Sequence, residues 1–362
     1  MNTKMNANYP IIFLVSVLFT IISTLLVKYL AGRFKIVDKP GPERKIHKTK
    51  VPLLGGLAVF LSFFIMLYFV REQLLAGNLE IHHWLGFFIG ACFLMMGGFL
   101  DDKYNLKPGW QFIFPVLASL AVVAGGVEIG KITNPLGGFL YLDQWKIPAG
   151  QWGGVARYFV VLSDSLIILW LLGMMYTTKL LDGLDGLVSG LGAIGGIIIF
   201  LFTITTKYYQ PDIGLAALIF SACCLGFLFF NWHPAKIFLG EGGSLLLGFI
   251  LGVLAIISGG KIAIALLVMG VPILDVVWTI IRRFVAGKNP FKFADRGHLH
   301  FRLFDLGLGQ KKTVLIFYFL ALIFGASGLF LQSLGKVFAL LVLFAIMLIL
   351  VIGFSYVDRK KV

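Results

Sequence analysis

Long apolar runs recur throughout this 362-residue chain. Several approach the ~20 residues that a helix needs to cross the hydrocarbon core of a bilayer. Overall, 59% of the residues are hydrophobic and 13% are charged. In lipid, backbone polar groups are satisfied only in helices or closed barrels, and continuous rather than alternating apolar runs favour helices. We therefore predict an all-α fold, a polytopic integral membrane bundle that forms a single domain over residues 1–362.

The runs predict eleven crossings. Their approximate limits are 11–30, 53–70, 84–100, 110–126, 165–181, 187–204, 213–230, 244–258, 262–280, 314–330 and 337–356. The first run is too long for the core of a signal peptide and lacks a cleavage site of small residues, so we expect a retained span. Cys92, Cys223 and Cys224 lie within apolar runs and predict neither a disulfide framework nor a metal site.

The chain has a formal net charge of +14, which in a soluble protein would suggest a nucleic-acid partner. In a membrane protein the distribution of Lys and Arg matters more than their total, and we expect no nucleic acid. The odd-numbered loops, counted from the first, and the C-terminal tail hold most of the 31 Lys and Arg. The positive-inside rule thus predicts a multi-pass protein of the plasma membrane with its N-terminus outside and its C-terminus in the cytoplasm.

Two carboxylates, Asp182 and Asp185, are each followed by a glycine where one apolar run ends and the next begins, and Lys179 lies three residues before Asp182. An ionisable group at a membrane boundary is expensive unless it is hydrated, paired or bound to a cation. A solvated turn explains this segment equally well, because Asp and Gly are common turn residues.

Two further acidic clusters fall on the same predicted side. Asp101 and Asp102 end the third span, and Asn105 would share a helix face with Asp101 if the helix continues. The second cluster, Gly240-Glu241-Gly242-Gly243, precedes a helix. Its glycines would let backbone N–H groups approach an anion, against which Glu241 could hold a metal ion, although a simple helix start capped by Ser244 is the alternative.

Basic residues also gather on this side. His47 and Lys48 lie in the first loop, where binding of a phosphate-bearing ligand competes with a purely topogenic role near anionic lipid. Arg296, His298 and His300 lie in the last large loop, and we expect them to donate to phosphate or sugar rather than to bind zinc. Asp275, within the ninth span, is either functional or paired with Arg282 or Arg283.

Carboxylates that can hold Mg²⁺, glycine loops that admit phosphate oxygens, and cationic donors are the parts used in phosphoryl transfer. In their order along the chain, these motifs resemble those of the polyprenyl-phosphate N-acetylhexosamine-1-phosphate transferases. That superfamily also includes the phospho-N-acetylmuramoyl-pentapeptide transferases of peptidoglycan synthesis. The resemblance covers nearly all of the chain. It implies transfer of a sugar 1-phosphate from a UDP-sugar, such as UDP-N-acetylglucosamine, to a polyprenyl phosphate such as undecaprenyl phosphate in a bacterial membrane. UMP would be released, with Mg²⁺ as cofactor or Mn²⁺ in its place.

The resemblance also implies roles for individual residues. It makes Asp101, Asp102, Asp182 and Asp185 catalytic, and it places the metal on Glu241 and Asp182. The residues expected to bind substrate are His47, Lys48, Asn105, Lys179, Gly240, Gly242, Arg296, His298 and His300. Four positions depart from the family pattern: Tyr176 and Lys179 replace asparagines, Glu241 replaces an aspartate, and Phe301 replaces a histidine.

Three other interpretations stay open. The first is the pentapeptide transferase branch, although its loop has three consecutive histidines where this chain has Arg-x-His-x-His. The second is an ion-coupled transporter using Asp275, which the clustering of charge at one face disfavours. The third is an inactive binding scaffold, which the four departures allow. A homodimer is also an open alternative.

Overall fold

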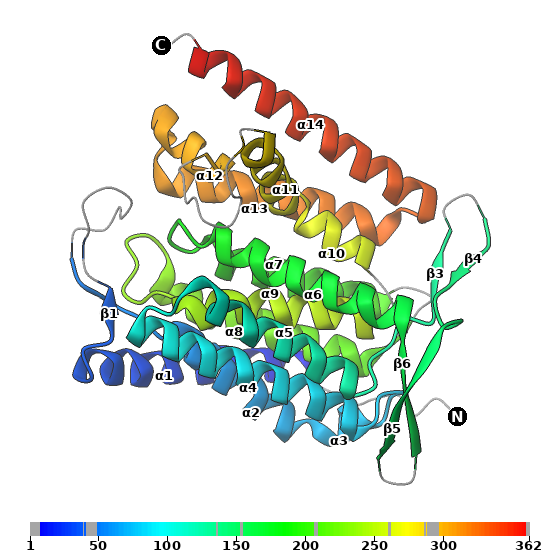
Figure 1. The fold of residues 1–362 in the computed structure, drawn as a ribbon. Helices are drawn as coiled ribbons and strands as arrows, with labels where there is room; N and C mark the ends of the chain where they lie inside the picture. Colours follow the sequence, from blue (N-terminus) through cyan, green and yellow to red (C-terminus); the bar gives the residue numbers. More distant parts are fainter. Residues whose placement is uncertain are drawn as a thin grey trace.

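The computed structural model describes residues 8–38, 40, 49–134, 137–152, 155–205, 209–259, 262–285, 287 and 297–359. The long helices lie side by side in a bundle (Figure 1). In chain order the helices are α1 Tyr9–Arg33, α2 Gly55–Phe69, α3 Arg71–Leu75, α4 Ile81–Tyr104, α5 Pro108–Ala124, α6 Val161–Leu181, α7 Leu187–Thr205, α8 Pro211–Asn231, α9 Gly240–Ile257, α10 Ile262–Val268, α11 Gly270–Val285, α12 Leu299–Leu303, a π-helical turn Phe304–Leu308, α13 Gly309–Phe330 and α14 Ser333–Arg359.

Each predicted crossing falls on an apolar helix or helix pair. Among the described residues, seven helices are long and apolar enough to cross a membrane, or eight if one bent pair counts as a span. Three shorter apolar helices are Gly55–Phe69, Pro108–Ala124 and Leu334–Leu350. The structure therefore supports a multi-pass helical protein, and the number of crossings and their orientation stay predictions.

The ninth predicted span is not one straight helix. It breaks at Met269 into α10 and α11, which meet at an angle of 80°. The prediction of one crossing over 262–280 therefore falls on two helices, because an apolar run shows which residues avoid water but does not show in which direction their helix travels.

Short strands qualify the all-α prediction. β1 Val37–Asp38 pairs antiparallel with β2 Val51–Pro52, β3 Lys131–Thr133 with β4 Phe139–Tyr141, and β5 Lys146–Trp152 with β6 Val155–Val160. The last two pairs form hairpins that project from one end of the bundle, opposite the end that carries β1 and α12 (Figure 1).

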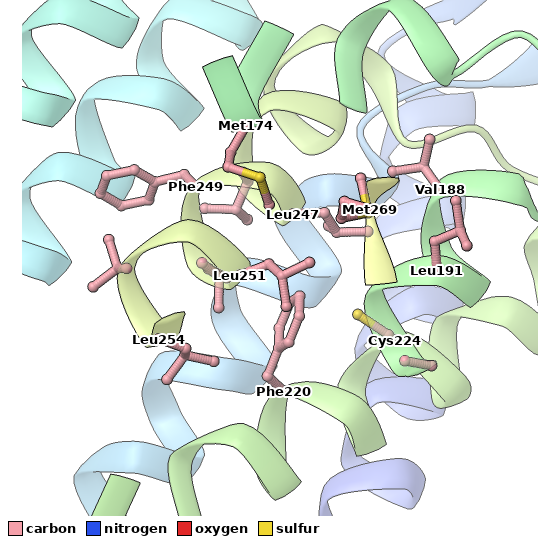
Figure 2. Packing of buried hydrophobic residues seen from close by; sticks show 14 of the residues in the cluster. Met174, Val188, Leu191, Phe220, Cys224, Leu247, Phe249, Leu251, Leu254 and Met269 are labelled. Atoms are coloured by element: carbon pink, nitrogen blue, oxygen red, sulfur yellow. The ribbon is translucent and has the colours of Figure 1, made fainter. Parts of the chain in front are cut away.

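Helix α9 lies at the centre of the bundle, and every residue from Gly242 to Ile256 is buried. Figure 2 shows its Leu247 and Leu251 in a buried cluster with Met174 of α6 and Phe220 of α8. Lipid is as apolar as these side chains, so close packing rather than water exclusion holds membrane helices together. The helix is therefore fixed by contact on all sides.

Two glycine pairs bring α9 against its neighbours. A Cβ added to Gly98 of α4 would lie 2.1 Å from Gly242 Cα, and one added to Gly56 of α2 would lie 2.1 Å from Gly243 Cα. Small residues allow such backbone contact between membrane helices. The beginning of α9 is thus fixed against the end of α4 and the beginning of α2.

Candidate active site at one end of the bundle

The acidic clusters predicted from the sequence meet at one end of the bundle. Asp101 and Asp102 lie in the last turn of α4, Asp182 directly follows α6, and Glu241 lies in the first turn of α9. This is the end that carries β1 and α12 (Figure 1). The site is therefore built by helix ends that the packing of α9 holds together.

Lys179 is the cation at the centre of the cluster. Its Nζ lies 2.7 Å from Glu241 Oε2 in an ion pair and donates to Gln111 Oε1 at 3.0 Å. The Glu241 backbone N–H in turn donates to Asp102 Oδ1 at 3.1 Å. An ammonium thus occupies the space between α5, α6 and α9, and Asp102 lies at the N-terminus of α9, where the helix dipole favours an anion.

Asp101 has a different environment from its neighbour Asp102. It is buried, and its Oδ1 accepts from the Leu106 N–H at 2.8 Å and from Gln111 Nε2 at 3.1 Å. These bonds join the end of α4 to α5. Helix α4 ends at Tyr104, and Asn105 follows in the left-handed region at φ 51, so the helix does not continue and Asn105 shares no helix face with Asp101.

Asp185 also contacts protein groups. Its Oδ2 lies 2.7 Å from His233 Nδ1 and accepts from the Ala235 N–H at 3.1 Å. On the other side of the same turn, the Gly186 N–H donates to Asn231 Oδ1 at 3.1 Å, and the Tyr318 hydroxyl donates to the Gly186 carbonyl at 2.5 Å. These bonds fix the turn that follows Asp182 against α8 and α13.

Asp182 is the least constrained carboxylate of the cluster. Within the described part of the chain we find no hydrogen bond to it, and solvent reaches its side chain although protein atoms crowd around it. Burial by these atoms raises the pKa of Asp182 to about 8, and the charges of Glu241, Asp185 and Asp102 add to the effect. A carboxylate in this state favours an added cation.

The two histidines of the last loop lie beneath the acidic turn. His298 and His300 are buried, and their rings stack with centroids 5.6 Å apart. A Cβ on Gly183 would lie 2.9 Å from His300 Nε2 and 2.6 Å from Phe301 Cζ, so the motif touches the turn that holds Asp182. Both ring nitrogens of His300 are buried, and neither has a hydrogen-bond partner among the described residues.

Asp275 pairs with this motif rather than with an arginine of its own helix. Its Oδ2 lies 2.9 Å from His298 Nδ1, and its Oδ1 accepts from the Leu299 N–H at 2.8 Å. The structural alternative of a pair with Arg282 or Arg283 is therefore not what the described residues form.

The other predicted site residues have diverse environments. Gly240 has φ +76, and a Cβ on it would lie 2.5 Å from Asp102 Oδ2, so it admits that carboxylate to the helix end. Gly242 packs against Gly98 and serves helix contact. His47, Lys48 and Arg296 lie outside the described residues.

Gln111, Asn231 and Tyr318 were not predicted from the sequence. Each is a single polar side chain beside or within an apolar run. Gln111 lies in the first turn of α5 and Asn231 ends α8. The signal that could have found them is this isolation, because polar groups among apolar neighbours are retained where they find partners.

The donor set fits only one mode of metal binding. Among the residues that the structure describes, no group of three or more His, Cys, Asp or Glu side chains could hold a metal ion. Mg²⁺ keeps several waters and takes one or two carboxylates plus substrate phosphates more often than it sits in an all-protein cage. Asp182, with Glu241 beside Lys179, fits that mode.

A bundle of apolar helices with a polar, charged cluster at one end indicates a multi-pass membrane protein with a candidate site at the ends of its helices. The sequence profile of glycosyl transferase family 4 matches residues 84–259. The chain is 32% identical to a probable undecaprenyl-phosphate N-acetylglucosaminyl 1-phosphate transferase of Bacillus subtilis, over 93% of this chain and 88% of the relative. It belongs to glycosyl transferase family 4.

Two other relatives show the range of this likeness. A decaprenyl-phosphate N-acetylglucosaminephosphotransferase of Mycobacterium tuberculosis is 30% identical over 84% of this chain and 78% of its own. A phospho-N-acetylmuramoyl-pentapeptide-transferase of Halalkalibacterium halodurans is 29% identical over 87% of this chain and 94% of its own. All three relatives are bacterial and carry names of transferases.

Proposed function

We propose that this protein transfers N-acetylglucosamine 1-phosphate, or a related N-acetylhexosamine 1-phosphate, from a UDP-sugar to a polyprenyl phosphate, and releases UMP. The names of its relatives support the polyprenyl phosphate acceptor and the transferred sugar phosphate. The observation that carries the proposal is the meeting of Asp102, Asp182, Lys179 and Glu241 at the ends of packed apolar helices. A lipid phosphate and a soluble nucleotide can meet only at such a boundary.

The reaction needs charge neutralisation and positioning more than covalent chemistry by the protein. A lipid phosphate oxygen attacks the sugar-bearing phosphorus, a new P–O bond forms, and the bond to UMP breaks. Asp102 positions the attacking phosphate and accepts any proton it loses, while Lys179 places a positive charge beside the phosphates. Mg²⁺ bound at Asp182 and Glu241 would supply further neutralisation.

Asp101 and Asp185 have supporting roles in this proposal. Each already bonds to backbone N–H groups and to one side chain, Gln111 or His233. They therefore shape the site by fixing the end of α4 and the turn after α6. His298 and His300 bind the nucleotide side of the substrate, together with Arg296.

The proposal includes the orientation in the membrane. Eleven crossings with the N-terminus outside would put the ends of α4 and α6, the beginning of α9 and α12 on the cytoplasmic face, where soluble UDP-sugars are found. The hairpins β3–β4 and β5–β6 would then lie on the outer face. The Lys and Arg asymmetry of the loops supports this direction.

The test is release of UMP by purified protein in detergent, with undecaprenyl phosphate and a panel of UDP-sugars. We expect release from UDP-N-acetylglucosamine or a close N-acetylhexosamine analogue that depends on the lipid. Asp182→Asn should lower turnover by roughly a hundredfold, the scale of losing one electrostatic or acid–base group. No release from any donor would contradict the proposal and favour an inactive scaffold.

A second candidate is the pentapeptide transferase reaction, which the Halalkalibacterium relative favours. The same assay with UDP-N-acetylmuramoyl-pentapeptide separates the two. Turnover of this donor above that of UDP-N-acetylglucosamine would assign the chain to the peptidoglycan reaction.

A further inference from the structure

Asp275 is a buried carboxylate that the proposed reaction does not use directly. It lies in α11 with 3% of its surface exposed. An ionised carboxylate in such a place needs hydrogen-bond donors, and both donors come from the beginning of α12. The His298 Nδ1 lies 2.9 Å from Oδ2, and the Leu299 N–H donates to Oδ1 at 2.8 Å.

We propose that Asp275 is a positioning residue of the nucleotide site and acts through His298. A carboxylate is acceptor-only, so it requires a proton on Nδ1 of the ring that faces it. Nε2 is then the ring nitrogen left for a phosphate oxygen. The name of the ligand rests on the proposed function, whereas the pairing of Asp275 with His298 does not.

The second oxygen of Asp275 fixes the backbone that carries His298. Its bond with the Leu299 N–H fixes the first turn of α12, which carries both histidines of the motif. The same turn touches Gly183 beneath Asp182. Asp275 therefore sets both the protonated nitrogen of one imidazole and the place of the motif against the acidic turn.

Other groups around the His298 ring do not take over this role. Thr279 Oγ1 lies 3.5 Å from Nδ1, a weaker contact than the carboxylate, and the His300 ring stacks above it. The charged side chains next to the preceding residue, Gly297, are Arg282 of α11 and Arg302 of α12, and Arg302 Nε donates to the Gly297 carbonyl at 3.1 Å.

Asp275→Asn removes the negative charge of the side chain and nearly keeps its shape. The amide can still accept from the Leu299 N–H, but it then presents an N–H to His298 Nδ1, which must become an acceptor. We expect thermal stability to be unchanged. The affinity for UDP and UDP-N-acetylglucosamine, measured by calorimetry, should be at least about tenfold weaker, because His298 Nδ1 loses its hydrogen bond to a charged carboxylate. Asp275→Glu should recover part of the affinity.

A spectroscopic signature tests the pairing without any ligand. The chain has six histidines, so ¹⁵N-histidine labelling with His298→Gln for assignment resolves the ring. We expect a protonated Nδ1 in the wild-type protein and an unprotonated Nδ1 in Asp275→Asn. The matched control is Asp164→Asn, an equally buried aspartate in the first turn of α6 that accepts from the Val160 N–H. It should change neither readout.

Wild-type affinity in Asp275→Asn, or an unprotonated His298 Nδ1 in the wild-type protein, would overturn the inference. The second of these needs no variant to fold. A wild-type protein that binds neither UDP nor UDP-N-acetylglucosamine would instead contradict the proposed function, and the nitrogen resonance would still confirm or refute the Asp275–His298 pair.

Discussion

Lys179 and Glu241 form the central ion pair of the site, at positions where the resemblance described above leads us to expect asparagine and aspartate. A protonated lysine cannot bind a metal ion, but it can neutralise a phosphate as a point charge. Glutamate reaches one methylene further than aspartate, which lets its carboxylate meet the ammonium at 2.7 Å. The geometry agrees with two substitutions that depend on each other.

We therefore predict coupling between these two residues. Glu241→Asp would shorten the reach to Lys179, and Lys179→Asn would leave Glu241 without its counter-ion, so each should lower turnover. The double variant should recover part of the loss. Turnover measured against Mg²⁺ concentration for all four forms gives a double-mutant cycle, and strictly additive effects would contradict the coupling.

Asp182 gives a prediction for pH. Its pKa of about 8 in the metal-free protein means that the carboxyl is mostly protonated at pH 7, and Mg²⁺ must displace that proton. Mg²⁺ affinity should therefore rise with pH, by up to about tenfold per unit below the pKa, and level off above it. Calorimetric titration between pH 6 and 9 measures this.

The control for this titration lies on the opposite side of the molecule. Asp143 is an exposed carboxylate between the two hairpins, so Asp143→Asn should keep the pH dependence, whereas Asp182→Asn should remove it. An affinity that does not change with pH in the wild-type protein would show that Mg²⁺ does not bind at Asp182.

At the scale of elements, the contact between the acidic turn and α12 is tight. A methyl group at Gly183 would lie 2.6 Å from Phe301 Cζ and 2.9 Å from His300 Nε2, so one of the two segments must move. We predict that Gly183→Ala lowers turnover roughly tenfold or more, because small displacements of reacting groups are costly. Gly183→Ala with Phe301→Ala should be more active than Gly183→Ala alone, and equal activity would contradict this explanation.

The sequence predicted the elements better than their contacts. Apolar runs locate the helices because a helix that crosses lipid needs a continuous apolar segment of sufficient length. They could not predict the bend at Met269, since direction is set by packing. The acidic clusters were likewise predicted from the sequence, but the partner of each carboxylate was not. Whether Asp101 contacts Gln111, or Asp182 has no hydrogen bond within the described part of the chain, depends on which helix ends the fold brings together.

At the scale of the whole molecule, the two ends of the bundle should lie on opposite sides of the membrane. Two exposed lysines mark these ends, Lys236 after α8 and Lys146 in β5. In a chain with its three cysteines replaced, we predict that an impermeant thiol reagent labels Lys146→Cys in intact cells and labels Lys236→Cys only after lysis. The reverse pattern would invert the topology, and labelling of both would place the two ends on one side.

The glycine pairs at the beginning of α9 also matter for how mutational tolerance is interpreted. Gly98, Gly242, Gly56 and Gly243 meet backbone to backbone, so almost any substitution there separates α9 from α4 or α2. A scan of activity alone would rank these four positions beside the carboxylates and suggest four more catalytic residues. Their variants should, however, lose thermal stability in proportion to activity, whereas Asp182→Asn should lose activity alone. In this protein, intolerance to substitution near the site therefore has two different causes, helix packing and chemistry. Only a paired measurement of stability and turnover tells them apart.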